Sequence, residues 1–321
     1  MKRIAFIGEC MIELNGSPFG EMIQTFGGDV LNSALYLSRA LSCQQSNQLE
    51  VFFISAIGDD PISKGMRERW QQEQINCQWV LEDKKYHSGI YLIQTDSNGE
   101  RTFLYWRNNS AASHLFQHPN FPLLANALDE FDAIYLSGIT LAIYSDNDKT
   151  QLINLIAHLA KLGKEIIFDS NYRPHLWEDH QTAKYWYQQL LPFISLALVT
   201  DDDEQKLWND TSINMTIQRL HHTGIKHIVV KSGKDGCYCS GFQPSILKVA
   251  ATKVEHVIDT TSAGDAFNAG FLAGYLNHLP IQQATEMGHL LAGRVIQHKG
   301  AIIPKEYTQP ITMTFFNNEK H

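Results

Sequence analysis

Short apolar runs alternate with helix-like stretches along most of this 321-residue chain, and this alternation restricts the folds available to it. Buried strands separated by helices favour parallel pairing, because the chain crosses back over the sheet before the next strand begins. The strand-like runs span 4–7, 51–57, 133–136, 165–168, 196–199 and 227–230. The helix-like stretches span 31–41, 61–74, 148–162, 181–191, 213–223, 265–277 and 281–298. The pattern predicts an α/β fold with a mostly parallel sheet, helices on both faces, and a site at the carboxyl ends of the strands.

Composition and charge argue against several classes of protein. The formal net charge is −8, whereas a nucleic-acid partner requires a basic face. No run of about eighteen apolar residues is present for a membrane span, and the first apolar run is too short for a signal peptide. Five scattered cysteines without metal or redox spacing fit a reducing cytoplasm. Since repeats and linkers are absent, residues 1–321 are expected to form one domain.

One stretch departs from the alternation and predicts a β-hairpin. The apolar runs 88–95 and 101–107 are joined by a segment that contains Asn98 and Gly99, a strong turn signal. Both faces of this hairpin carry apolar side chains, so both faces need a partner. We therefore expect a lid whose inner face meets a ligand and whose outer face meets another subunit, which makes the protein a homo-oligomer.

The inner face of the hairpin offers polar groups to a ligand. Strand alternation places Phe103, Tyr105 and Arg107 on one side. Arg107 could grip a carboxylate with two parallel hydrogen bonds, while a solvated arginine at a sheet edge is the alternative interpretation. Tyr91 lies on the face opposite Tyr105 if the turn has two residues, and alongside Tyr105 if a three-residue loop with a left-handed Gly99 connects the strands.

A second arginine follows another predicted strand. The segment DSNYR at 169–173 comes directly after the run 165–168, so Arg173 is expected at the functional edge of the sheet. There it would complete a carboxylate clamp with Arg107. Simple turn chemistry is the alternative, because Asp, Ser and Asn all favour turns.

Three further polar turns are less specific. Glycines 27–28 lead into a helix, where Asp29 and Asn32 could bond hydroxyl groups, although most such pairs are only turns. The segment KSGKDG at 231–236 could hold nucleotide phosphates, yet the chain contains neither the P-loop motif nor the dinucleotide-binding motif. The acidic run at 201–204 could hold Mg²⁺ through water, while a solvated helix start is the preferred interpretation for at least two of its four residues.

The most specific local signal is the segment DTTSAGD at 259–265, which leads into a helix-like run. Backbone N–H groups at a helix start have no intrahelical partner and attract anions. Ser262, Ala263 and Gly264 are small enough for a phosphate to contact the backbone. Asp265 would lie beside that phosphate, where a carboxylate makes sense as the acceptor of the proton of an attacking hydroxyl. An Asp that caps a helix packed through Ala and Gly is the alternative.

Together these motifs resemble those of the PfkB/ribokinase family of small-molecule kinases. One family pattern corresponds to GGDVLNSA at 27–34 with GDDP at 58–61, and the other corresponds to DTTSAGD at 259–265. The resemblance covers nearly the whole chain, with both patterns in the family order. Within the family, similarity to the 2-keto-3-deoxygluconate kinases rests on GECMIEL at 8–14, YWRN at 105–108, DSNYRP at 169–174 and GAIIP at 300–304.

The resemblance implies a Rossmann-like domain with a small β lid, formed mainly by about 86–108 and part of 12–27, that covers the sugar and often builds a dimer. It implies that Asp265 accepts the proton of the C6 hydroxyl of the sugar acid, which attacks the γ-phosphate of ATP. Backbone N–H groups of Ala263, Gly264 and Asp265 would stabilise the developing charge. The residues implied for the sugar acid are Gly28, Asn32, Tyr91, Tyr105, Arg107, Arg173 and Asp265. Those implied for ATP are Asp201, Lys231, Ser232, Gly233, Lys234, Asp235, Gly236, Ser262, Ala263, Gly264 and His289, which would lie against adenine.

Some parts of the assignment differ from the family or stay open. Mg²⁺ is expected to bridge the phosphates, but Asp201 stands where the family's Asn-x-x-Glu motif has Asn, so no metal ligand is assigned. A kinase of fructose or ribose is one alternative. The argument against it is that a neutral sugar is expected to leave two arginines unpaired, which is costly. A non-catalytic sugar sensor on a kinase scaffold is another, although a sensor has no use for Asp265 as a base beside phosphate.

Overall fold

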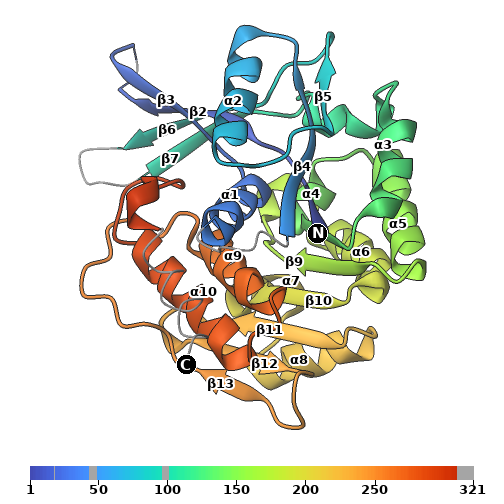
Figure 1. Ribbon diagram of the computed structural model, residues 1–321, viewed down its shortest axis with the longest axis vertical. Coiled ribbons are helices and arrows are strands. Elements are labelled where there is room, and N and C mark those ends of the chain that lie inside the picture. Colours follow the sequence, from blue (N-terminus) through green and yellow to red (C-terminus); the bar gives the residue numbers. More distant parts are fainter. Residues whose placement is uncertain (18, 43–48, 96–100, 309–321) are drawn as a thin grey trace.

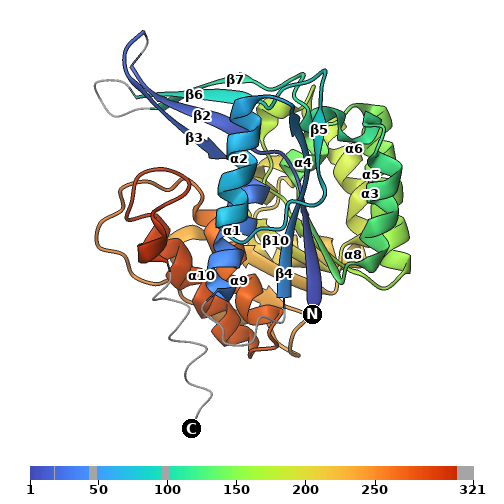
Figure 2. The ribbon, with the colours of Figure 1, turned by 45° about the horizontal axis from the view of Figure 1, so that its top comes forward.

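The computed structural model of the protein describes residues 1–17, 19–42, 49–95 and 101–308. Its strands are β1 (Lys2–Ile7), β2 (Met11–Gly16), β3 (Met22–Gly27), β4 (Leu49–Gly58), β5 (Val80–Asp83), β6 (Ile90–Thr95), β7 (Arg101–Trp106), β8 (Ala133–Ser137), β9 (Glu165–Asp169), β10 (Leu196–Thr200), β11 (His227–Lys231), β12 (Cys237–Ser240) and β13 (Leu247–Val249). They form a nine-stranded sheet in the order β13-β12-β11-β10-β9-β8-β1-β4-β5 and a four-stranded sheet in the order β3-β2-β6-β7 (Figures 1 and 2).

The large sheet confirms the predicted α/β fold. Its strands from β11 through β5 pair in parallel, and only β12 and β13 run antiparallel at one edge. All six predicted strands are present. The sequence reasoning missed β5 and β13, which are short strands at the two edges and have too few residues for a clear apolar run, whereas β12 corresponds to the strand-like run around Cys237 and Cys239.

Helices cover both faces of this sheet, as predicted. They are α1 (Asp29–Leu41), α2 (Pro61–Gln72), α3 (Phe121–Ala127), α4 (Gly138–Ala142), α5 (Asp146–Lys161), α6 (His180–Leu190), α7 (Asp201–Trp208), α8 (Ile213–His222), α9 (Ala263–Tyr275) and α10 (Ile281–Val295). Short 3₁₀ turns span Ala112–Gln117, Leu128–Glu130, Pro174–Leu176, Leu191–Phe193, Gly233–Asp235 and Lys305–Tyr307. Within the described residues, no helix combines the length and the apolar character that crossing a membrane requires.

Alternation along the strands divides the apolar side chains between two cores. In β1, Ile4 and Phe6 join the core under α1, α2, α9 and α10, whereas Ala5 and Ile7 join the core under α3 to α8. Figure 2 shows these two groups of helices on opposite sides of the sheet. Because both faces of each central strand are buried, the strands read as continuous apolar runs in the sequence.

Helices α9 and α10 lie unusually close together because glycines face each other across the contact. A Cβ added at Gly270 would lie 2.6 Å from the carbonyl oxygen of Met287, and one at Gly274 would lie 2.6 Å from the Cα of Ala284. The alternative interpretation of 259–265, a helix that packs through small residues, is therefore correct for the body of α9. It is compatible with a ligand site at the start of the same helix.

The predicted hairpin is present as β6 and β7, and β2 and β3 extend it to four strands. Tyr91 pairs directly with Tyr105, so both side chains lie on one face, and their ring centroids are 5.9 Å apart. This is the arrangement that the longer of the two expected turns requires, although residues 96–100, including Asn98 and Gly99, lie outside the described part. The four-stranded sheet projects from the body above the start of α1 (Figure 2).

Candidate active site

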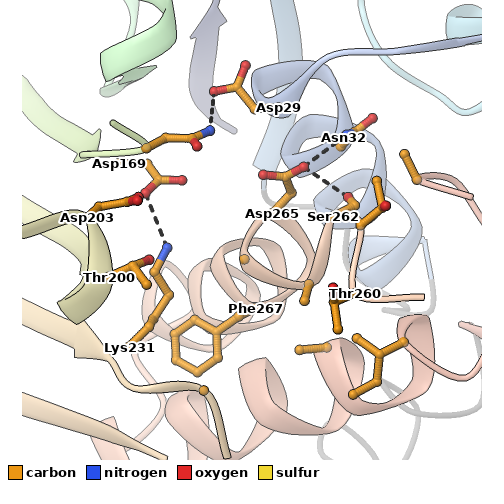
Figure 3. A pocket seen from close by; sticks show the side chains of 18 of the residues that line it. Asp29, Asn32, Asp169, Thr200, Asp203, Lys231, Thr260, Ser262, Asp265 and Phe267 are labelled. Carbon is orange, nitrogen blue, oxygen red and sulfur yellow. Dashed lines mark hydrogen bonds and ion pairs between the residues drawn. The ribbon is translucent and has the colours of Figure 1, made fainter. Parts of the chain in front are cut away.

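A cavity of about 1110 Å³ opens between the four-stranded sheet and the carboxyl ends of the parallel strands. Its lining includes the inner face of the small sheet, the start of α1, the ends of β9 to β11, the turn before α9 and one side of α10. Nearly all of the predicted sugar-acid and nucleotide residues therefore share one space. Figure 3 shows the side chains of Asp29, Asp169, Lys231 and Asp265 around its central part.

The turn at 259–265 leads directly into α9, as predicted. Ser262 takes a left-handed conformation with φ of 63°, and its side chain does not cap the N–H groups of the first turn. Asp259 holds the turn in place, since it accepts hydrogen bonds from the N–H groups of Thr261 (3.0 Å) and Gly300 (2.7 Å). The start of α9 lines the cavity from Ser262 to Asp265.

One part of the predicted anion site is wrong. The N–H group of Ala263 donates to the carbonyl oxygen of Thr260 at 3.2 Å, so it is not free for a phosphate. The N–H groups of Gly264 and Asp265 belong to the first helical turn, where no intrahelical acceptor exists. An anion at this helix start would therefore contact two backbone N–H groups of the three that the sequence suggested.

Asp265 is the carboxylate at this helix start, and its environment favours proton uptake near neutral pH. Its Oδ2 accepts hydrogen bonds from Asn32 Nδ2 (2.9 Å) and Ser262 Oγ (2.9 Å). Burial, followed by the charge of Asp29, raises the pKa of Asp265 to about 7, against the lowering effect of the Asn32 hydrogen bond. A carboxylate with a pKa near the working pH is well suited to general-base catalysis.

Gly28 and Asn32 lie where the sequence placed them, at the start of α1. A Cβ at Gly28 would overlap the carbonyl oxygen of Glu9, so only glycine lets α1 begin this close to the end of β1. The close approach brings Asn32 to Asp265, 233 positions along the chain. Asn32 therefore contacts the proposed base itself, as well as lining the cavity.

The inner face of the small sheet supplies Tyr91, Tyr105 and Arg107 to the cavity, as predicted. Arg107 is buried and forms an ion pair with the buried Glu9, a partner that the sequence reasoning missed. The Tyr91 hydroxyl donates to Glu13. Because Arg107 already has a carboxylate partner, it is neither a solvated edge arginine nor a free cation.

Arg173 lines the same cavity from the loop after β9, as expected for a strand end. Its Nη1 lies 3.4 Å from Asp203 Oδ1, and its side chain is 45% exposed. Asn171 of the same loop donates to Asp29 at 2.8 Å. Since both arginines have acidic partners, the argument that a neutral sugar would leave them unpaired is wrong.

The other end of the cavity is lined by Lys231, Gly233, Lys234 and Gly236, together with one side of α10. Ser232, Asp235 and Asp201 do not line it, contrary to the prediction. The Ser232 hydroxyl instead donates to Asp201, which ties the glycine turn to the start of α7. These two side chains thus brace the turn.

His289 lies in this end of the cavity, on α10. Its side chain is buried and contacts the ring of Phe267 edge-on, with centroids 5.0 Å apart. Burial lowers the pKa of His289, so the ring is neutral at neutral pH, and its Nε2 has no hydrogen-bond partner among the residues described. A neutral ring beside an apolar wall suits a flat heteroaromatic group. The wall consists of Val254, Val257, Ala292, Gly293 and Ile296.

The acidic run forms the start of α7, and two of its four residues, Asp201 and Asp202, remain accessible to solvent, which agrees with the preferred interpretation. Asp202 is exposed and lines the cavity, whereas Asp203 and Glu204 are buried. Glu204 pairs with Arg219 at 2.5 Å, and burial raises its pKa to about 7. Across the described ranges, no group of three or more His, Cys, Asp or Glu side chains could hold a metal ion.

Comparisons with known proteins agree with what the geometry of the site indicates. The family model described as pfkB family carbohydrate kinase matches residues 1–307. The chain belongs to the PfkB family of carbohydrate kinases. A relative named 2-dehydro-3-deoxygluconokinase from Haemophilus influenzae is 53% identical over 306 residues, which cover 95% of this chain and 96% of the relative. A relative of the same name from Dickeya dadantii is 40% identical over 95% of this chain and 98% of its own length.

Solved structures show the same fold at low sequence identity. The crystal structure of 2-dehydro-3-deoxygluconokinase from Thermotoga maritima has a TM-score of 0.78 and 16% identity, covering 97% of this chain and 99% of that chain. Fructokinase with bound ATP from Xylella fastidiosa has a TM-score of 0.81 and 15% identity, covering 99% of each chain. The kinase therefore has the ribokinase-like arrangement of a large sheet and a small separate sheet.

Three residues of the kinase that line or support its cavity were not assigned from the sequence. Glu9 follows β1 and pairs with Arg107, Asp169 ends β9, and Asn268 lies one helical turn beyond Asp265. A signal for the first two existed, since polar residues at the carboxyl ends of buried parallel strands face the functional edge. No local signal marks Asn268, because an isolated Asn within an apolar helix becomes informative only once its partners are known.

Proposed function

We propose that this kinase transfers the γ-phosphoryl group of ATP to the C6 hydroxyl of 2-keto-3-deoxygluconate, producing 2-keto-3-deoxy-6-phosphogluconate and ADP. The observation that carries the proposal is the position of Asp265, at a helix start and in one cavity with Arg107 and Arg173. The two full-length relatives at 53% and 40% identity support the choice of this sugar acid. The enzyme would act in sugar-acid catabolism in the cytoplasm.

Asp265 is proposed as the general base. In the reaction, the C6 hydroxyl gives its proton to Asp265, the oxygen forms a bond to the γ-phosphorus, and the bond from that phosphorus to the bridging oxygen of ADP breaks. A pKa of about 7 leaves Asp265 largely ionised above neutral pH, yet basic enough to take up the proton. The N–H groups of Gly264 and Asp265 at the start of α9 would stabilise charge on the transferring group.

The sugar acid is proposed to lie between the small sheet and the start of α1. Arg173 is the half-exposed cation and would meet the carboxylate, while Arg107, held by Glu9, would present a fixed guanidinium edge. Gly28, Asn32, Tyr91 and Tyr105 line the remaining surface, so hydroxyl groups have polar partners there. The ion pairs of the arginines suggest that the substrate carboxylate competes with Asp203 for Arg173.

ATP is proposed to lie along the other half of the cavity, with adenine against His289 and its phosphates toward Lys234, Gly236 and the start of α9. Mg²⁺ accompanies the nucleotide in this proposal, and the residues present are compatible with one mode of binding the ion. Without an all-protein cage among the described residues, Asp202 and Asp203 would hold the ion through water while the phosphates supply the other oxygens. When bound, the ion neutralises phosphate charge.

The small sheet is proposed to act as a lid and as a dimer interface. Its inner face lines the cavity, whereas Leu104 and Trp106 on the opposite face of β7 are 40% and 60% exposed. Two large apolar side chains exposed next to each other on one face of β7 favour a partner surface over permanent contact with water. A second copy of the same sheet would cover them.

The test of the proposed reaction is ADP release with Mg-ATP across a panel of acceptors. 2-Keto-3-deoxygluconate should give the highest kcat/KM, well above gluconate, fructose and ribose. Asp265→Asn serves as the matched control, because it keeps the size and the hydrogen-bonding capacity of the side chain and removes the base. Higher kcat/KM with a neutral sugar would assign the kinase a different substrate, and no turnover with any acceptor would favour a sensor.

A further inference from the structure

A buried network of polar side chains lies directly behind the central part of the cavity. Lys231 Nζ lies 3.2 Å from Asp169 Oδ1 and donates to Asn268 Oδ1 at 2.9 Å. The Asn268 amide nitrogen in turn donates to Asp169 Oδ2 (2.8 Å) and to the Tyr135 hydroxyl (2.9 Å). Three elements distant in sequence, β9, β11 and α9, thus hold one ammonium group in a single position.

That ammonium group faces the same space as Asp265. Lys231 lines the cavity although it is only 7% exposed, and a Cβ added at Gly264 would lie 3.8 Å from Lys231 Nζ. Figure 3 shows Lys231 and Asp265 on two sides of the same open space, on different elements. An ammonium has three N–H donors, and two of them have partners among the described residues. The third remains for a ligand at the start of α9.

The charges around this space make a cation necessary. Asp29, Asp169 and Asp265 all line it, and burial raises the pKa of both Asp29 and Asp265, with neighbouring carboxylates adding to the effect. A phosphoryl group that enters among carboxylates is repelled unless a positive charge lies close by. Arg107 is the other buried cation of the cavity lining, but it pairs with Glu9 on the lid side.

We propose that Lys231 donates its third N–H to the transferring γ-phosphoryl group, and that Asp169 and Asn268 are positioning residues that hold the ammonium for this contact. The inference rests on the proposed phosphoryl transfer, although not on the identity of the sugar. Lys231 keeps its proton throughout: the substrate proton goes to Asp265, the new O–P bond forms, and ADP leaves. Because the contact strengthens as charge develops on the phosphoryl oxygens, Lys231 acts on kcat as well as on binding.

The first test compares a nucleotide that carries a γ-phosphate with one that lacks it. Lys231→Met removes the charge and keeps most of the side-chain volume. Calorimetric titration should show a loss of about 10- to 100-fold in affinity for a non-hydrolysable ATP analogue, the scale of one charge-assisted hydrogen bond, with little change for ADP. Lys226→Met is the matched control, since Lys226 is exposed and precedes the opposite end of the same strand. Equal losses for both nucleotides would overturn the proposal.

The second test separates binding from folding. Lys231→Met leaves Asp169 buried without its cation, so this variant could unfold for reasons unrelated to ATP. The double variant Asp169→Asn with Lys231→Met removes both charges and should restore the Tm toward that of the parent protein. We expect it to keep the weakened affinity for the ATP analogue, the nearly unchanged affinity for ADP and a reduced kcat. A folded double variant with normal discrimination between the two nucleotides would refute the role of Lys231.

A wrong role for Lys231 can be distinguished from a wrong choice of sugar substrate. If 2-keto-3-deoxygluconate is not phosphorylated, the nucleotide titrations still report on Lys231, because they contain no sugar. Lys231→Arg adds a further comparison, since it retains the charge with a different shape. It should bind the ATP analogue better than Lys231→Met does, and an affinity no better than that of Lys231→Met would contradict a role based on charge.

Discussion

Turnover by this kinase is expected to fall steeply as the pH drops through 7, because Asp265 must be ionised to accept a proton. Burial first, and the charge of Asp29 second, raise its pKa to about 7, so the active ionised form is present above this pH and lost below it. At pH 6 about one tenth of the enzyme would carry an ionised base, against about nine tenths at pH 8. The expected decrease in kcat/KM is therefore about tenfold between pH 8 and pH 6.

The assay is ADP release at low sugar-acid concentration, between about pH 5.5 and 8.5, with magnesium in excess so that nucleotide protonation does not contribute. Asp29→Asn removes the second-largest cause of the raised pKa and should move the acidic limb to lower pH. Glu178→Gln, an exposed carboxylate outside the cavity, should leave the limb unchanged. A flat profile through pH 6, or a limb that does not move in Asp29→Asn, would refute the assignment of the limb to Asp265.

Three other predictions concern the base, the arginines and the lid. Asp265→Asn should lower kcat by roughly 10²–10⁴, because the base is removed. The same variant should raise the Tm at pH 8. A carboxylate whose pKa is raised by folding destabilises the folded state at any pH above its ordinary pKa, here by at most about 4 kcal/mol. An unchanged kcat would remove Asp265 from the mechanism. Arg173→Ala should raise the KM for the sugar acid far more than that for ATP without changing the Tm. Arg107→Ala should also lower the Tm, since Glu9 would stay buried alone; equal effects on both substrates would argue against a carboxylate clamp. Trp106→Glu should convert a dimer to monomers in light scattering, and an unaltered mass would exclude this face as the interface.

Much of the fold followed from local sequence properties. The six buried strands are continuous apolar runs because helices cover both faces of the sheet, and such runs are visible without any partner. The hairpin was predictable from its turn signal and from two neighbouring apolar segments. The short edge strands β5 and β13 were not, because three or four residues carry no period that distinguishes a strand from a loop.

The candidate site was predictable to a smaller extent. Asp265, Gly264 and the glycine turn at 27–28 lie in compact motifs whose residues act through their own backbone. The pairing of Arg107 with Glu9 and the hydrogen bond from the Ala263 N–H group to Thr260 changed the expected chemistry, and neither follows from a motif. A partner 98 positions away is invisible to local patterns, because only the pairing of β2 with β6 and of β6 with β7 brings the two segments into contact.

The order of apolar and polar residues by itself determined the layered α/β architecture, the edge of the sheet at which polar groups gather, and the helix start that carries the proposed base. These are properties of single segments and their period. The tertiary structure decided the charge state of that edge: which arginines are already paired, how far burial raises the Asp265 pKa, and where Asp169 and Asn268 hold Lys231. Such properties depend on distances and burial between segments that only the folded chain brings together.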